Sequence, residues 1–194
     1  MRITPLLLVL ALAATASAQT NWEFRLSSDV ITPAEPRVTV TIAAAFPPPD
    51  FAFAAANWSV HATEPGWSDP ENLPLQIPPT PIPCASCAGI IDGPDVLSIS
   101  HGQLHAFGLP ADPANPIPVW KATFTVTDFT PRQIDLSTTT TRFEVYVVDP
   151  VSGVPLRESR IVDEGRATIR VIPAPAPVAA LGLGVLAARR RPVR

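Results

Sequence analysis

Cys84 and Cys87, in the run "PCASCAG", are the only two cysteines of the chain. Their C-x-x-C spacing suits a local disulfide, a redox pair or one half of a zinc site. No second C-x-x-C follows, and the preceding "IPPTPIP" does not predict the helix N-terminus at which redox pairs usually lie. A structural disulfide between Cys84 and Cys87 is the main prediction, with reduced thiols and redox chemistry as alternatives.

His101 and His105 in "SHGQLHAF" have the spacing that places two zinc ligands on one face of a helix. Gly102 and the flanking alternation favour a strand instead, and no HExxH motif is present. Oxygen ligands occur in two loops, as Asp92 and Asp95 in "IDGPDV" and as Asp112 and Asn115 in "ADPANP". Neither loop has the acidic spacing of a calcium loop, and both suit turns. We therefore predict no metal and no cofactor, with a structural calcium ion as the alternative.

Motifs of catalysis are missing from the sequence. There is no G-x-S-x-G elbow and no glycine-rich phosphate loop, so we predict a protein that is not an enzyme, with an exported hydrolase as the alternative. Among the tryptophans, Trp120 alternates with core positions and is predicted to be buried. Trp67, in the polar run "EPGWSDP", is predicted to be exposed and to contact a ligand, because an indole face suits the face of a sugar ring.

Period-two alternation of apolar residues marks the elements that must position these side chains. It is clear in "NWEFRLS", "RVTVTIAAAF", "FAFAAANWSVHA", "PDVLSISHG", "GQLHAFGL", "VWKATFTVTDF", "RQIDLST", "TRFEVYVVD" and "GRATIRVI". Such alternation, with β-branched and aromatic residues, is typical of half-buried strands. The alanines between Phe51 and Trp58 would also permit a short helix. Eight or nine short strands predict an all-β fold, an antiparallel β-sandwich or jelly roll.

Most of the 25 prolines lie between Phe46 and Val119. Proline has no amide hydrogen for a central strand to donate, so these residues belong to strand edges and loops. We predict a proline-rich excursion at about 64–83. It either decorates an edge of the sandwich or takes part in binding.

The N-terminal residues 1–18 have the parts of a secretory signal peptide. Arg2 is followed by an apolar stretch, which is too short to span a bilayer, and then by Ala16-Ser17-Ala18. We therefore expect export and a folded domain over residues 19–172. Five of the 14 basic residues lie outside that domain, which leaves nine against 17 acidic residues. An acidic body of this kind does not suit nucleic acid.

The C-terminal residues 173–194 combine Pro173-Ala174-Pro175, an apolar run from Val178 to Ala188, and Arg189-Arg190-Arg191. As a helix at about 1.5 Å per residue the apolar run covers about 16 Å, roughly half of a hydrocarbon layer of about 30 Å. Such a segment would pause in the inner membrane, with its arginines held on the cytoplasmic side.

This order of parts resembles the PEP-CTERM sorting signal of exported bacterial proteins, which implies handling by an exosortase-type membrane transpeptidase. Pro173, Ala174 and Pro175 match the recognition motif, and Arg189, Arg190 and Arg191 match the basic end. The family motif has a glutamate where this chain has Ala174. Asn57-Trp58-Ser59 fits the N-glycosylation pattern. Because the tail implies a bacterial host, we do not predict glycosylation at Asn57.

The core is similar to the cohesin and carbohydrate-binding sandwiches in "SSDVITPAEPRVTVTI" and "VWKATFTVTD". The resemblance implies a sandwich and transfers no site residues. The sequence as a whole predicts an exported protein of the cell envelope, cell surface or extracellular matrix, with a structural or adhesive role. The alternative is a carbohydrate- or protein-binding module, with a surface polysaccharide as a candidate partner.

Overall fold

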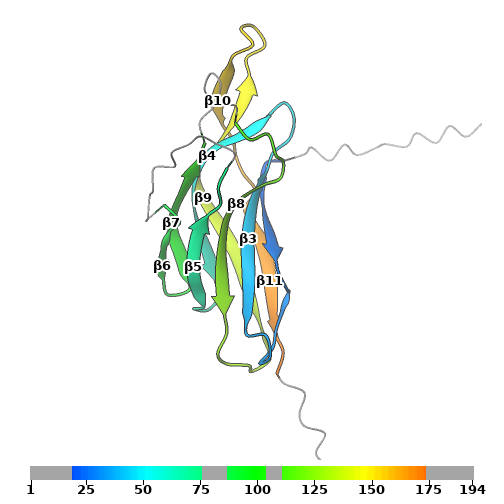
Figure 1. Cartoon of the computed structure of the whole chain (residues 1–194), viewed down its shortest axis with the longest axis vertical. Coiled ribbons are helices and arrows are strands. Elements are labelled where there is room, and N and C mark those ends of the chain that lie inside the picture. The colour runs from blue at the N-terminus through cyan, green and yellow to red at the C-terminus, as the bar shows by residue number, and fades with distance from the viewer. Residues whose placement is uncertain (1–18, 76–86, 104–110, 174–194) are drawn as a thin grey trace, which may run out of the picture.

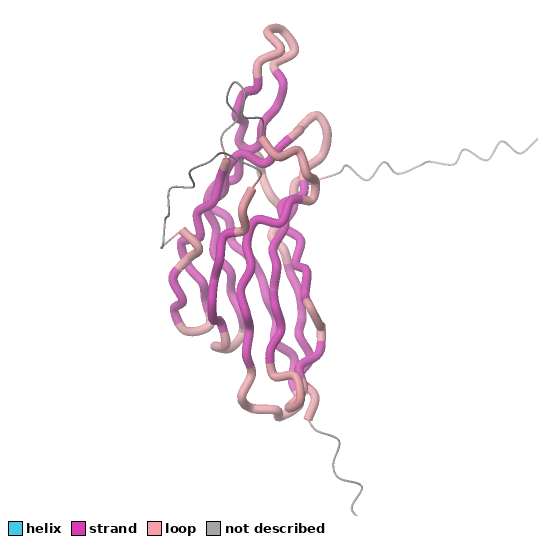
Figure 2. Tube along the Cα trace, viewed as in Figure 1, coloured by secondary structure: helices cyan, strands magenta, loops and turns pink. Residues whose placement is uncertain are grey.

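The structure, a computed structural model, describes residues 19–75, 87–103 and 111–173. These residues form strands and loops, without helix (Figure 2). Within them, no helix is long and apolar enough to cross a membrane. The strands are β1 (Asn21–Leu26), β2 (Val30–Ile31), β3 (Arg37–Ala45), β4 (Ala52–Ala62), β5 (Trp67–Asn72), β6 (Ile90–Asp92), β7 (Asp95–Gly102), β8 (Ile117–Thr125), β9 (Arg132–Val148), β10 (Pro155–Ser159) and β11 (Arg166–Val171).

Two sheets pack face to face (Figure 1). The smaller sheet has the strand order β1-β3-β8-β5, and the larger has the order β2-β11-β9-β4-β7-β6, with β10 paired to β9. The pairs between named strands are antiparallel except that of β11 with β2. The predicted all-β antiparallel sandwich is confirmed. The described strands outnumber the expected eight or nine because short strands such as β2 and β6 show too little alternation to be recognised.

The alternation of the sequence decides which face of each strand is buried. Val38, Val40 and Ile42 of β3 are at most 1% exposed, and Trp120 and Phe124 of β8 are fully buried. Burying an aliphatic or aromatic side chain of this size contributes about 1.5–3 kcal/mol. A slip of one residue would turn every one of these side chains to water, so the register is strongly determined.

Aromatic rings fill the space between the sheets. The rings of Trp22 and Trp58 have their centroids 4.7 Å apart, and Phe143 meets Trp22 edge-on at 5.1 Å. Trp67 makes edge contacts with Trp120 and Phe124. The rings therefore join strands of both sheets into one core.

The strand predicted from "FAFAAANWSVHA" is confirmed as β4, and the alternative of a short helix from Phe51 to Trp58 is wrong, because β4 pairs with both β7 and β9. One other interpretation of the sequence is also wrong. The two strands expected after Pro131 are one 17-residue strand, β9. The four threonines between its halves are β-branched and continue the strand.

The predicted excursion at 64–83 is structured in its first part, where β5 pairs with β8. The remainder of that excursion, from residue 76, lies outside the described residues. So do the predicted signal peptide at 1–18, residues 104–109 of the strand expected over 102–109, and the apolar helix of the tail.

The long axis of the molecule has two different ends. At one end β10 and the second half of β9 form a projecting hairpin, and at the other end β11 leads out of the sandwich (Figure 1). Val151 at the hairpin tip is 93% exposed. The chain therefore leaves the sandwich after β11 at the end opposite to the hairpin.

Candidate functional site

The outer face of the larger sheet carries a patch of hydroxyl and amide side chains. Asn57 and Ser59 alternate outward along β4, and Ser59 lies opposite Thr139 of β9. The hydroxyl of Thr141 donates to the backbone oxygen of Asn57 over 3.1 Å. Strand alternation places Asn57 and Ser59 on one face, because successive residues point to opposite faces. Thr141 joins them through a second bulge, where the pairing of β4 with β9 jumps from Asn57–Arg142 to Trp58–Thr140.

A β-bulge interrupts this face between β4 and β7. The pairing jumps from Trp58–Ile99 to Val60–Val96, so one residue of β4 faces two residues of β7. Ser98, in the bulge, has a φ of 60°, a left-handed conformation that costs a non-glycine residue about 1–2 kcal/mol. Its amide donates to Ser59 Oγ over 3.3 Å. Strain of this kind gathers at functional sites.

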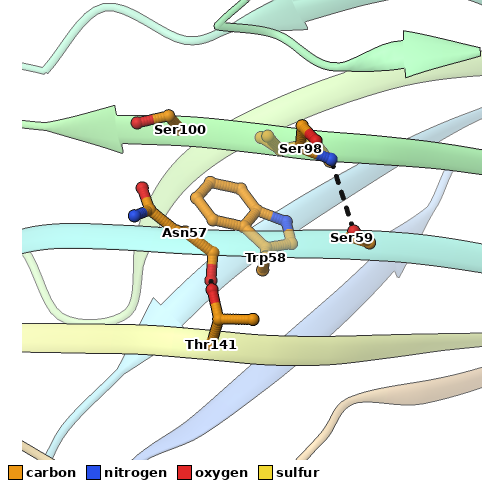
Figure 3. Close-up of a pocket in the computed structure, with 7 residues that line it drawn as sticks. Asn57, Trp58, Ser59, Ser98, Ser100 and Thr141 are labelled. Carbon is orange, nitrogen blue, oxygen red and sulfur yellow. Dashed lines mark hydrogen bonds between the residues drawn. The ribbon is translucent and has the colours of Figure 1, made fainter.

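The bulge opens a hollow of about 380 Å³ (Figure 3). It is lined by Asn57, Trp58, Ser59, Ser98, Ile99, Ser100 and Thr141. All of these side chains are uncharged, and most of them carry a hydrogen-bonding group. The volume is at the lower end of the range for small-molecule sites, about 300–1,000 Å³.

The indole of Trp58 packs on Trp22 between the two sheets, and in the view of Figure 3 it is seen in the gap between the ribbons of β4 and β7, with its nitrogen on the side of Ser98. The side chain is 2% exposed, and among the described residues its Nε1 has no hydrogen-bond partner. The other three tryptophans donate from Nε1 to Thr140, Pro94 and Ala88 respectively, over 2.8–2.9 Å. A buried donor without an acceptor is uncommon in folded proteins, so Trp58 marks this site.

His61 joins three strands beside the hollow. Its Nδ1 lies 3.0 Å from Asp95 Oδ1 of β7, and its Nε2 lies 2.8 Å from Thr139 Oγ1 of β9. The order of carboxylate, imidazole and hydroxyl is that of a nucleophile relay. A relay also needs donors for the oxyanion, and the strands here pair their amides in the β4–β9 ladder. We assign this trio to cross-strand bonding.

A second hollow, of about 260 Å³, lies on the outer face of the smaller sheet. Its lining includes Asp69, Thr39 and the ion pair of Glu71 with Lys121, whose atoms are 3.1 Å apart. Asp69 lies at the bulge of β5 with a φ of 53°. Among the described residues, Asp69 and Ser98 are the non-glycine residues with positive φ, and each lines one hollow.

The prediction that Trp67 is exposed is wrong. Trp67 begins β5, is 6% exposed, and packs its ring against Trp120 and Phe124. Its polar sequence neighbours suggested a loop, but the pairing of β5 with β8 turns the indole inward. Trp120 is buried as predicted.

Cys87 is disulfide-bonded and lies in the turn before β6. Cys84 lies outside the described residues, so the Cys84–Cys87 bridge stays a prediction. In the tail, Pro173 is described and exposed. Ala174, Pro175 and the arginines Arg189, Arg190 and Arg191 lie outside the described residues.

His101 packs against Phe53 with ring centroids 6.5 Å apart, and burial lowers its pKa. His105 lies outside the described residues. Asp95 bonds His61, and Asp112 accepts the amide of Ala114 in a turn. Within the described ranges, no group of three or more histidine, cysteine, aspartate or glutamate side chains could hold a metal ion.

Sequence reasoning missed the hollow. Alternation predicts that Asn57 and Ser59 face the same way, but the bulge at Ser98 has no glycine or proline to announce it. The sequence feature at this place is Asn57-Trp58-Ser59, which matches the N-glycosylation pattern and does not predict a hollow.

The fold and the hollow define a two-sheet β-sandwich with a polar site on one outer face. No protein-family model matches the chain, and no curated protein matches it. Among solved structures the chain is similar to the seventh ScaB type I cohesin from Pseudobacteroides cellulosolvens. The identity is 14% and the TM-score 0.48, over 82% of this chain and 96% of that one.

A second similar structure is a type I cohesin–dockerin complex, Coh-OlpA-Doc918, from Clostridium thermocellum. Here the identity is 10% and the TM-score 0.42, over 77% of this chain and 99% of that one. Both structures contain cohesins, the kind of sandwich that the sequence resembles.

Proposed function

We propose that this chain is an exported β-sandwich module with a structural or adhesive role, and that it is not an enzyme. It is displayed at the cell envelope, on the cell surface or in the extracellular matrix. It makes contact through the outer face of its larger sheet. The observation that carries the contact face is the uncharged hollow at the bulge of Ser98, above a tryptophan with an unpaired indole N–H.

Display depends on the tail. An exosortase-type membrane transpeptidase recognises Pro173-Ala174-Pro175 while the apolar run contacts the inner membrane and Arg189, Arg190 and Arg191 stay in the cytoplasm. The amide of Ile172 still donates to Ile31 over 2.9 Å, and Pro173 follows immediately and is exposed. The exposure of Pro173, the first residue of the motif, directly after this hydrogen bond supports access by a processing enzyme.

The end-to-end arrangement of the module fits this attachment. The chain leaves β11 at the end opposite the hairpin (Figure 1). A molecule held through its C-terminus therefore points its hairpin away from the membrane and presents both sheet faces sideways, toward neighbouring molecules or a matrix.

Mass spectrometry of the envelope fraction tests the sorting. We expect mature protein that begins at Gln19 and lacks the segment after Pro175. The matched variant replaces Arg189, Arg190 and Arg191 with serine, and it should be released with its tail intact. Wild-type protein in the envelope that still ends at Arg194 would contradict the proposal.

A binding assay with isolated envelope tests the contact face. Ser100→Arg places a long cation in the hollow and should abolish binding. Thr39→Arg, at an exposed position of the smaller sheet, should leave binding unchanged. Equal binding by both variants and the wild type would exclude the larger sheet as the contact face.

The second candidate function is a carbohydrate- or protein-binding module of the envelope, with a surface polysaccharide as one partner. The hydroxyl-lined hollow favours it, because such a lining suits a small polar ligand better than a large apolar one.

A further inference from the structure

We infer that the hollow at the Ser98 bulge binds one unit of a neutral polysaccharide. The inference rests on the proposed function, in which this face makes the contact, and adds the class of ligand. It requires a ligand oxygen that accepts the Trp58 indole N–H, together with hydroxyls that match the rim.

The Trp58 indole provides the donor. Its Nε1 has no acceptor among the described residues, although the side chain is almost fully buried. A buried donor loses its hydrogen bonds to water on folding, and an acceptor in the hollow would restore one. The bulge lies directly beside this indole, between the pairs Trp58–Ile99 and Val60–Val96, and Trp58 is one of the residues that line the hollow.

The rim determines the charge of the ligand. Ser59, Ser98, Ser100 and Thr141 carry hydroxyls, which both donate and accept, and Asn57 carries an amide, which does the same. Sugar hydroxyls also do both. No arginine, lysine or carboxylate is among the lining residues, so an anionic sugar would lose its hydration without an ionic partner.

The position within the sheet favours a saccharide over a peptide. An extended peptide commonly binds by adding a strand to a free sheet edge. Both β4 and β7 are interior strands, in the order β9-β4-β7-β6. β6 pairs with β7 only from Asp95 to Leu97, but beyond it the Ser100 N–H donates to Cys87 O and the Ser100 oxygen accepts from Asn72 Nδ2, so these backbone groups are not free for an added strand. A compact ring with peripheral hydroxyls suits an open hollow of this size, whose rim residues Asn57, Ser98, Ser100 and Thr141 are exposed.

The binding of a single unit should be weak. The indole of Trp58 offers its edge and lies under the sheet, so no lining residue offers an exposed aromatic face for stacking. Many copies on one surface would strengthen the contact, because linked sites bind a polymer together with a high effective concentration. This matches an adhesive role.

Proton–nitrogen correlation spectra of the exported protein test the inference at one atom. The spectrum contains one indole signal for each of the four tryptophans. Addition of a neutral oligosaccharide panel, made of glucan, mannan and galactan fragments, should shift the Trp58 signal downfield. The signals of Trp22, Trp67 and Trp120 should stay in place, because their N–H groups already have acceptors. Acidic oligosaccharides should leave all four signals unchanged.

Variants of the rim complete the test. Thr141→Val and Ser100→Ala should each weaken binding of the active oligosaccharide about threefold to tenfold. Thr39→Val on the smaller sheet is the matched control and should have no effect. Trp58→Phe should remove binding, and its unfolding curve shows whether the fold is kept. If Trp58→Phe does not fold, the loss of binding in Thr141→Val and Ser100→Ala, at exposed positions of the rim, decides the test.

Three results would overturn the inference. They are an unchanged Trp58 signal with every neutral oligosaccharide, a shift with acidic oligosaccharides alone, and a shift with peptides alone. A failure of the proposed function gives a different result. If Ser100→Arg and the wild type bind the envelope equally, the outer face of the larger sheet is not the contact face. If Ser100→Arg loses envelope binding but no neutral sugar shifts Trp58, then the contact face stands and the saccharide does not.

Discussion

Asp50 and Arg160 form a two-point ion pair at the base of the projecting hairpin. Arg160 Nη2 and Nε donate to the two carboxylate oxygens of Asp50 over 2.6 and 2.9 Å. The Asp50 side chain is 2% exposed, and that of Arg160 is 26% exposed. The hydrogen bonds to Asp50 raise the pKa of Arg160. The pair fastens the segment after β10 to the loop between β3 and β4.

Removal of the cation should be costly. We expect Arg160→Met to lower the free energy of unfolding by about 3 kcal/mol, because it leaves the Asp50 carboxylate buried without its partner. Arg170→Met is the control. This variant breaks the ion pair of Arg170 with Asp29, and both of these side chains are more than half exposed. It should lower the free energy of unfolding by less than about 1 kcal/mol. Urea unfolding measures both, and equal losses would contradict the assignment.

Ser98 and Ser100 should respond in opposite ways to glycine. Ser98→Gly removes a side chain from a left-handed position, and we expect a gain of about 0.5 kcal/mol after the entropy of glycine is subtracted. Ser100→Gly, in the same strand, should cost about 1 kcal/mol. Thermal unfolding of the two variants shows the signs. A loss in Ser98→Gly equal to that in Ser100→Gly would mean that the bulge is not strained.

His101 should make the protein less stable in mild acid. Burial lowers its pKa from 6.5, while a hydrogen bond with the Leu73 backbone acts in the other direction. In the unfolded chain His101 takes up a proton as the pH falls through about 6.5, whereas in the folded chain it stays neutral to lower pH. The unfolded state then binds more protons than the folded state. The free energy of unfolding therefore decreases as the pH is lowered through about 6.5.

Urea unfolding at about pH 7.5 and about pH 5.5 measures this effect. His101→Gln should show a smaller loss between the two values than the wild type. The same loss in both proteins would show that other groups carry the dependence.

The predicted Cys84–Cys87 bridge should contribute modestly to stability. A bridge that closes so short a loop contributes about 2 kcal/mol or less. The turn that begins at Cys87 is held in addition by two backbone oxygens, which accept Ser100 N–H and Trp120 Nε1–H respectively. We expect intact mass to show the loss of two hydrogens, and Cys84→Ser with Cys87→Ser to fold with a slightly lower melting temperature. Two free thiols in the exported protein would contradict the bridge.

The patterned strands could be predicted because their information is local. Val38, Val40 and Ile42 alternate with polar residues, and any strand with that pattern must turn the same face inward. Trp67 could not be placed in this way. Its neighbours are polar, and only the pairing of β5 with β8, more than fifty positions later in the chain, buries its indole.

The amino-acid sequence by itself determined the all-β class, most of the buried face, and the acidic balance of the domain, because composition and period-two order act within each strand. Only the tertiary structure decided where β4 and β7 fall out of register, that Ser98 has a positive φ there, and that Trp58 Nε1 finds no partner among the described residues. The physical reason is that a bulge belongs to a pair of strands, and a hydrogen bond is lost or kept only when both partners are in place.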